Sequence, residues 1–340
     1  MRILKNVKLA PYTTFRIGGP AELFAEAKSL SEIKESVKFA RKNKLKIFVL
    51  GGGSNILISD DGVRGLVLRL LIRGADFRDK GSFVLASVGA GEIWDKVVAW
   101  AVRHNFGGIE NLSLIPGTVG GAVHQNIGAY GTELKDVLHS VNALNIKSGE
   151  VLRLSKKGCR FGYRDSIFQH KIGKNYIVLS AVLRLDKKPK PKIIYSDLVK
   201  YFQNKKEPSI QKIREAVIRI RRSKLIYPDQ FFGTAGSFFK NPVISSGVYK
   251  RLIGLHPGLK GRISGRNLVK LSAGQLIELS GWKGKRIGSV GVSKKHALVL
   301  VNYGRGRAQD IKKFASLIGS DVERKFGVKL EPEVRFVGEI

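Results

Sequence analysis

Apolar residues recur along the chain at two spacings, which predict where its helices and strands lie. Near the amino terminus, Ile33, Val37 and Ala40 fall on one face of an expected helix that Ser31 caps. The apolar run KIFVL follows as a strand, and further strands are expected at GLVLRL, SFVLASVGAG, VNALNI and YIVLSAVLRL. The pattern therefore predicts both helices and strands throughout the chain.

Two further helices and one change of composition organise the rest of the sequence. Helices are expected over Glu92–Asn105 and over Gln309–Phe326, with Gly327 ending the second. Between them, the charged, proline-containing stretch Asp186–Pro208 leads into the basic helix IQKIREAVIRIRRSK. This stretch marks a candidate domain boundary.

Length and composition indicate a globular protein with more than one domain. At 340 residues the chain is too long for one compact core, and 43% hydrophobic with 26% charged residues exclude a disordered chain. No apolar run approaches the ~20 residues that a membrane helix needs, and no signal-peptide core is evident, so we expect a cytoplasmic protein. The single cysteine, Cys159, is expected to pack internally, and no Cys/His cluster has zinc spacing, so no metal is expected.

Positive charge exceeds negative charge by a wide margin. The 61 Lys and Arg residues against 27 Asp and Glu residues leave a net charge of +34, which attracts nucleic acid, anionic membranes or phosphorylated substrates. The lysines are spread along the chain without a basic tail, which favours a solvated basic surface. A nucleic-acid role stays open as an alternative, centred on the basic helix, where Ile213, Val217 and Ile220 recur beneath the arginines.

Two glycine-rich loops follow apolar segments. GGGSN covers Gly51–Asn55, and IPGTVGGAVHQNIGAYG covers Ile115–Gly131 with almost no charge, as expected of a loop ordered against a ligand. Neither loop fits the GxGxxG dinucleotide fingerprint, and the sequence has no GxxxxGK[ST], HExxH or GxSxG motif. The backbone N–H groups of two such loops can still hold a diphosphate.

One serine stands between a glycine and two phenylalanines, in GTAGSFFKNP, Gly233–Pro242. The glycine leaves room for a ligand to approach Ser237, and the phenylalanines are expected to keep water from whatever that serine touches. The alternative is an ordinary turn that leads into an apolar strand.

Seven segments occur together in one order: GGGSN, ENLSLIPGTVGGAVHQNIGAYG, YRDSIF, GTAGSFFKNP, SAGQLIELSGWKGKRIG, KHALVLVN and LEPEVRFVG. The set closely resembles the UDP-N-acetylenolpyruvoylglucosamine reductases over nearly the whole chain, and YSDL at Tyr195 is similar to an element of their longer subclass. The resemblance implies an α+β fold: a two-subdomain FAD-binding fold of the vanillyl-alcohol oxidase type plus a C-terminal α+β substrate domain. The implied domains are residues 1–70 with the strand 331–340 returning to them, residues 71–208, and a substrate-binding domain over residues 209–330.

The resemblance also implies a flavoenzyme of peptidoglycan precursor synthesis. FAD takes a hydride from NADPH and passes it to UDP-N-acetylglucosamine enolpyruvate, giving UDP-N-acetylmuramate, and the expected protein is a monomer with no nucleic-acid or membrane partner. Residues of both loops are expected to hold FAD without a covalent bond: Gly51, Gly52, Gly53, Ser54, Asn55, Pro116, Gly117, Thr118, Gly120, Gly121, Asn126, Gly128 and Ala129.

The family pattern gives the serine a chemical role. Hydride addition to one carbon of the enolpyruvyl double bond leaves carbanion character on the carbon beside the carboxylate, and Ser237 is expected to protonate that carbon. Arg164 and Glu333 match the residues that stabilise the excess charge, with Glu333 protonated or bridged by Arg164 when substrate is bound. From the residues alone, Arg164 and Asp165 could instead form a structural ion pair, and Glu333 could face solvent.

Further residues match the family's contacts to the diphosphate and uridine: Tyr163, Arg164, Tyr195, Lys224 and Asn241. His296 stands where some relatives have a glutamine, and YPDQ at Tyr227 is a second departure. Another flavin oxidoreductase of the same fold, acting on a small alcohol or sugar, is the main alternative.

Overall fold

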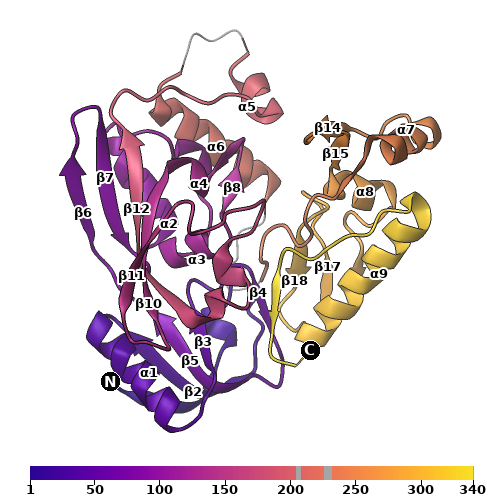
Figure 1. Cartoon of the computed structure of the whole chain (residues 1–340). Coiled ribbons are helices and arrows are strands. Elements are labelled where there is room, and N and C mark those ends of the chain that lie inside the picture. The colour runs from indigo at the N-terminus through magenta and orange to yellow at the C-terminus, as the bar shows by residue number, and fades with distance from the viewer. Residues whose placement is uncertain (204–207, 226–231, 340) are drawn as a thin grey trace. The chain divides into compact units, whose positions relative to one another are not determined.

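The computed structural model describes residues 1–203, 208–225 and 232–339, and it divides the chain into two compact units (Figure 1). The first unit contains Met1–Val7, Ala21–Gly52 and Arg64–Arg221, and the second contains Lys8–Pro20, Gly53–Val63 and Arg222–Ile340. The three-part division expected from the sequence stays a prediction. Tyr227 lies outside the described residues.

A four-stranded sheet and one covering helix begin the first unit. The sheet has the order β1-β2-β5-β3, formed by β1 (Ile3–Lys8), β2 (Pro20–Ala27), β5 (Val63–Leu70) and β3 (Ile47–Leu50), with β3 and β5 parallel. Helix α1 (Leu30–Lys42) buries the expected apolar face in the same hydrophobic cluster as strand β5. The predicted cap was wrong by two residues: Ser29, not Ser31, accepts from the backbone of Glu32 in a capping box.

A five-stranded antiparallel sheet is the second sheet of the first unit. Its order is β11-β10-β12-β7-β6, formed by β11 (Val151–Ser155), β10 (Leu138–Asn145), β12 (Tyr176–Asp186), β7 (Phe83–Gly89) and β6 (Ala75–Asp79). Helices α2 (Trp94–Arg103) and α3 (Val119–His124) share one hydrophobic core with this sheet. The strands predicted at SFVLASVGAG, VNALNI and YIVLSAVLRL are therefore confirmed, and the structure shows that they lie side by side in one sheet.

Short elements and the basic helix complete the first unit. They are β8 (Gly128–Ala129), β9 (Thr132–Glu133), α4 (Leu134–Val137), α5 (Ser196–Tyr201) and α6 (Ile210–Lys224). The basic helix is α6, and its Ile213, Val217 and Ile220 are buried in one cluster with Leu198 of α5. The predicted apolar face of this helix is confirmed as a packing face.

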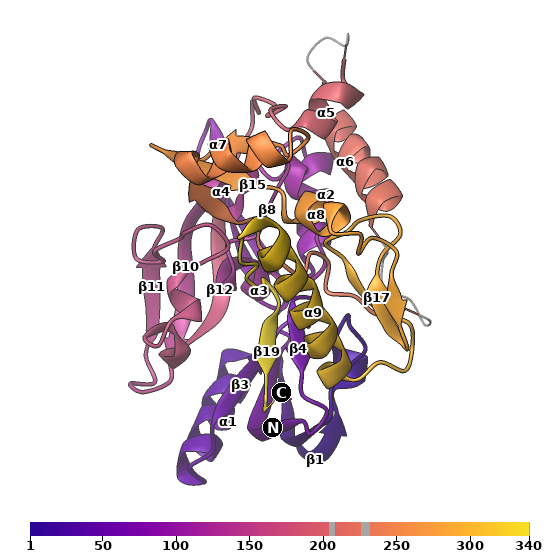
Figure 2. The same ribbon diagram turned by 90° about the vertical axis from the view of Figure 1, so that its right-hand side faces the viewer.

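The described residues of the second unit form three small sheets and three α-helices around their own core. One sheet contains β13 (Val243–Ser245), β15 (Leu268–Leu271) and β14 (Gly261–Ile263), and another contains β16 (Arg286–Ile287), β17 (Val290–Val292) and β18 (Leu300–Asn302). The third is the parallel pair β4 (Ile56–Ile58) and β19 (Arg335–Val337), seen side by side in Figure 2. The helices are α7 (Ser246–Leu255), α8 (Ala273–Leu279) and α9 (Ala308–Phe326). Gly327 ends α9 in the left-handed conformation at φ 62°, as the sequence predicted.

Candidate functional site

The two glycine-rich loops meet in the first unit, although more than sixty positions separate them in the sequence. A Cβ atom on Gly52 would lie 2.7 Å from the Cα atom of Gly117, and one on Gly51 would lie 2.9 Å from the Oγ1 atom of Thr118. Only glycine allows this approach of the two backbones. The Thr118 hydroxyl oxygen is buried and has no hydrogen-bond partner among the described residues, so it is available to a ligand.

The loop Ile115–Gly131 is held in shape from the segment that opens α2. The backbone N–H of Trp94 donates to Gly117 O at 3.1 Å, that of Val119 to Glu92 O at 2.9 Å, and that of Gly120 to Ala90 O at 2.9 Å. These bonds fix the loop without any ligand. The glycine approach, the unpartnered hydroxyl and the preset loop fit a bound diphosphate such as that of FAD.

Asn126, which the sequence analysis assigned to the cofactor, is fully buried, and both the nitrogen and the oxygen of its side-chain amide make hydrogen bonds. Its Nδ2 donates to Gly162 O at 2.8 Å and to Glu133 Oε2 at 3.0 Å, and its Oδ1 accepts from the N–H of Lys135 at 3.0 Å. These contacts join the glycine-rich loop to the turn that carries Arg164. A contact of Asn126 with the cofactor stays a prediction.

Arg164 occupies the left-handed backbone region, with φ 55°, which is uncommon for a residue other than glycine. The turn is closed by the N–H of Gly162 donating to Asp165 O at 3.0 Å, and Gln169 Nε2 donates to Arg164 O at 2.9 Å. The guanidinium carbon lies 5.6 Å from the ring centre of Tyr163, and Asp165 contacts His170 Nε2 at 2.8 Å. Such outliers often accompany function, because the surrounding bonds must offset the strain.

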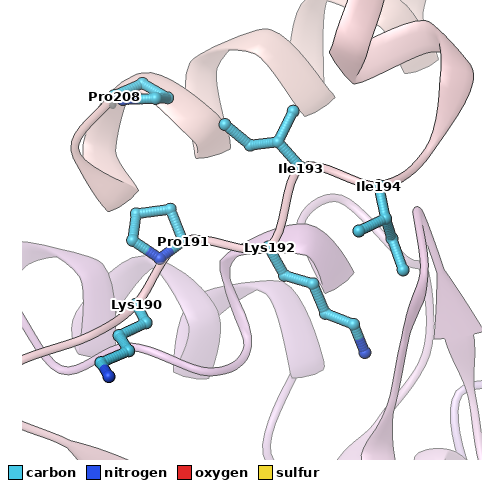
Figure 3. Close-up of a pocket in the computed structure, with 6 residues that line it drawn as sticks. All are labelled: Lys190, Pro191, Lys192, Ile193, Ile194 and Pro208. Atoms are coloured by element: carbon cyan, nitrogen blue, oxygen red, sulfur yellow. The ribbon is translucent and has the colours of Figure 1, made fainter. Parts of the chain in front are cut away.

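Tyr195 caps α5 and packs edge-to-face on Tyr130 of the glycine-rich loop, with ring centres 5.3 Å apart. The buried Asn111 ties the two segments together, since its Nδ2 donates to Tyr130 O and to Lys192 O, both at 2.9 Å. A cavity of about 460 Å³ lies beside this segment, lined by Lys190, Pro191, Lys192, Ile193, Ile194 and Pro208 (Figure 3). No predicted catalytic residue lines this cavity, so we place no chemistry there.

The second unit brings the segments of Ser237 and Glu333 side by side through backbone hydrogen bonds. Ser237 pairs with Val299, the N–H of Phe238 donates to Leu298 O at 2.8 Å, and the N–H of Glu333 donates to Phe238 O at 2.7 Å. The backbone carbonyl of Glu333 accepts from Asn55 Nδ2 at 3.1 Å, so the last residue of the GGGSN loop contacts the segment that carries Glu333. Three predicted site residues are thereby assembled within one unit.

The neighbouring phenylalanines belong to the core of the second unit. Phe238 is 0% and Phe239 3% exposed, and the ring centre of Phe238 lies 6.3 Å from that of Phe15. Their burial fixes the segment that carries Ser237. Gly236, at φ 74°, forms a bend before Ser237, and Ser237 makes an isolated backbone bridge with Val299, so the role of its hydroxyl stays a prediction.

The remaining predicted substrate residues are spread over both units. Asn241 Oδ1 accepts from the N–H of Ala273 at 3.0 Å, and Lys224 is the last residue of α6. His296 Nδ1 accepts from the N–H of Leu298 at 3.2 Å, so in the neutral ring the hydrogen is on Nε2. At Gly53 a Cβ would lie 2.0 Å from Tyr12 O, so this glycine is required by the fold itself.

Two residues with a part in shaping the loop were missed by the sequence analysis. Asp95 accepts from the N–H of Leu114, and it pairs with Arg214 of the basic helix. The partners are more than a hundred positions apart in the sequence, and no local pattern marks them. No group of three or more His, Cys, Asp or Glu side chains able to hold a metal occurs among the described residues.

Comparison with known proteins gives the relationship directly. Residues 21–155 match the family described as "FAD binding domain", and residues 228–337 match "UDP-N-acetylenolpyruvoylglucosamine reductase, C-terminal domain". A UDP-N-acetylenolpyruvoylglucosamine reductase of Photobacterium profundum is 43% identical over 99% of this chain and 96% of its own, and one of Pseudomonas aeruginosa is 40% identical over 98% of each. The chain belongs to the UDP-N-acetylenolpyruvoylglucosamine reductase family.

The solved structures agree with this membership. The crystal structure of the family member from Thermus caldophilus matches with a TM-score of 0.71 and 28% identity, covering 99% of this chain and 100% of that chain. The expected α+β flavin-binding fold with a C-terminal domain is confirmed, as is the resemblance drawn from the seven segments. The roles of the individual site residues stay predictions.

Proposed function

We propose that the protein reduces UDP-N-acetylglucosamine enolpyruvate to UDP-N-acetylmuramate with electrons from NADPH, as a step of peptidoglycan precursor synthesis. Family membership over the whole chain supports this activity. The observation in the structure that carries it is the close approach of Gly51 and Gly52 to Gly117 and Thr118, which leaves a buried hydroxyl beside two glycine backbones. That arrangement fits a flavin diphosphate.

Residues of both loops would hold FAD, and the buried Thr118 hydroxyl and the backbone N–H groups of Gly51 and Gly52 are donors suited to phosphate oxygens. The chemistry that FAD supplies when bound is hydride transfer from NADPH to the enolpyruvyl double bond. The protein's own residues handle the charge and the proton that remain. This division explains why the sequence needs no nucleophile, metal or dinucleotide fingerprint.

Proton delivery is assigned to the hydroxyl of Ser237. Its segment is fixed by the backbone hydrogen bonds of Phe238 to Leu298 and Glu333 and by the buried ring of Phe238, so the hydroxyl is presented from a rigid support. Glu333 lies on the adjacent segment, and Arg164 is the cation proposed to balance the substrate carboxylate. Lys224, Asn241 and His296 are proposed to contact the nucleotide, together with Tyr163 and Tyr195.

The finer properties of the protein are proposed on the same basis. We expect a cytoplasmic monomer that acts on a small-molecule UDP-sugar and has no nucleic-acid or membrane partner. No helix among the described residues is both long and apolar enough to cross a bilayer. The arginine-rich helix, the candidate for a nucleic-acid surface, directs Arg214 to Asp95 of its own unit.

Anaerobic flavin spectroscopy tests the proposed function. NADPH should bleach the flavin absorbance, and UDP-N-acetylglucosamine enolpyruvate should restore it. UDP-N-acetylglucosamine, which lacks the enolpyruvyl group, is the matched control and should not. Reoxidation by simple alcohol-derived carbonyl compounds, with no response to the enolpyruvyl sugar, would favour the alternative flavin oxidoreductase.

A further inference from the structure

One carboxylate joins the basic helix to the start of the glycine-rich loop. Asp95 lies in the first turn of α2, and its Oδ1 accepts from the N–H of Leu114 at 2.5 Å. Arg214 of α6 donates to the same carboxylate through both arms of its guanidinium, Nη1 to Oδ1 at 2.7 Å and Nη2 to Oδ2 at 3.0 Å. The side chains are only 15% (Arg214) and 26% (Asp95) exposed, so solvent screens this pair weakly.

Leu114 has a backbone conformation that its neighbours must stabilise. It has φ 59°, in the left-handed region that a branched apolar residue rarely adopts, and it directly precedes Ile115, the first residue of the loop. On its amino-terminal side, Trp94 Nε1 donates to Leu112 O at 2.9 Å. The bond from Leu114 to the Asp95 carboxylate is therefore one of several that set the direction in which the chain enters the loop.

The electrostatics show that Asp95 depends on its partners. Burial alone raises the pKa of this carboxyl, but hydrogen bonds from Arg214 and from the Leu114 backbone, with the nearby charge of Arg221, outweigh burial and hold the pKa below its ordinary value. Without Arg214, the half-buried carboxylate would lose its main countercharge. It would then be a weaker acceptor for Leu114 and would draw in water.

We propose that Asp95 and Arg214 are positioning residues for the cofactor loop, and that their ion pair sets the affinity for FAD by holding Leu114 in its left-handed conformation. The inference rests on the proposed function, in which this loop holds FAD. It also gives the arginine-rich helix a use inside its own unit: the helix supplies the cation that keeps the loop preset before FAD arrives.

The test measures FAD dissociation constants by the quenching of flavin fluorescence when FAD is added to full-length apoprotein. Arg214→Met and Asp95→Asn should each weaken FAD binding about tenfold, the size expected for one charge-assisted hydrogen bond. The double variant should bind FAD no more weakly than the worse single variant, because both changes remove one interaction. Lys212→Met, which removes an exposed cation from the same helix, is the matched control and should bind FAD like the wild type.

Thermal unfolding of each apoprotein separates positioning from a purely structural role. Positioning predicts that FAD affinity falls while the unfolding midpoint of the apoprotein changes little between Arg214→Met and Lys212→Met. Should Arg214→Met fail to fold, Arg214→Lys keeps the charge but loses the two-armed geometry, and it should give a smaller loss of affinity.

Affinities of Arg214→Met and Asp95→Asn within about twofold of the wild type, well below one charge-assisted bond, would overturn the proposal. Additive losses in the double variant would also overturn it, because the two residues would then act separately. A wild-type protein that binds no FAD at all would instead overturn the proposed function.

Discussion

Replacing Ser237 by alanine separates proton delivery from every other step. The change removes one hydroxyl from a half-buried position, while the backbone bonds of Phe238 to Leu298 and Glu333 remain. Because the neighbouring rings stay buried, the cost to folding should not exceed that of one hydrogen bond, about 0.5–1.5 kcal/mol. Loss of a general acid should cost at least ~10²-fold in rate, or about 2.7 kcal/mol in the barrier, so the effect on catalysis should exceed the effect on stability.

Stopped-flow absorbance of the flavin records the two halves of the reaction as distinct steps. Ser237→Ala should bind FAD and be reduced by NADPH like the wild type, since reduction of the flavin needs no proton on a substrate carbon. Reoxidation by UDP-N-acetylglucosamine enolpyruvate should slow by at least ~10²-fold. Ser237→Cys, which keeps a proton donor at the same position, should recover part of the rate.

Two results would refute this reasoning. Reoxidation of Ser237→Ala within about threefold of the wild type would show that the hydroxyl does not deliver the proton, because a general acid contributes far more. Equal losses in both half-reactions, or loss of FAD, would show that the serine serves the fold.

Three further predictions follow from the described contacts. Gly52→Ala should weaken FAD binding about tenfold or more, because its Cβ would lie 2.7 Å from Gly117 Cα. Gly247→Ala, whose Cβ meets nothing within 4 Å, is the control and should leave FAD binding unchanged, as fluorescence titration of both variants would show. Asn126→Ala should lower the free energy of unfolding by roughly 1–3 kcal/mol, since a fully buried amide leaves its partners unsatisfied, and denaturant titration of the apoprotein measures this. Burial raises the pKa of the Cys159 thiol to about 11, so the thiol stays protonated at pH 8, and iodoacetamide at that pH should label it only in the unfolded protein. Rapid labelling of the folded protein, measured by mass spectrometry, would contradict the burial of Cys159.

The sequence predicted an element and its ends correctly where a single local preference determines them. The apolar stripe and the terminal glycine gave α9 and its end, because a left-handed C-terminal residue is nearly always glycine. The cap of α1 was misplaced because two serines compete there, and the choice is made by Glu32, which completes a capping box only with Ser29.

The site was predictable only in part, since its parts meet through the tertiary fold. The sequence identified both glycine-rich loops, but not that Gly52 and Gly117 approach within van der Waals distance. It assigned Asn126 to the cofactor, while the structure shows its amide bonded to the turn of Arg164. Asp95 and Arg214 carry no local signal, because an ion pair between distant segments depends on how α2 and α6 pack.

The central claim is that this chain adds two hydrogens to the enolpyruvyl double bond, one as hydride and one as a proton that the hydroxyl of Ser237 delivers. The direct measurement is mass spectrometry of the nucleotide sugar after a single turnover of NADPH-reduced protein in deuterated water. Because a serine hydroxyl exchanges with the solvent, the account predicts UDP-N-acetylmuramate with deuterium on the carbon beside the carboxylate. Ser237→Ala should form at least ~10²-fold less of this product over the same short time. Unchanged UDP-N-acetylglucosamine enolpyruvate after full reduction of the flavin would contradict it.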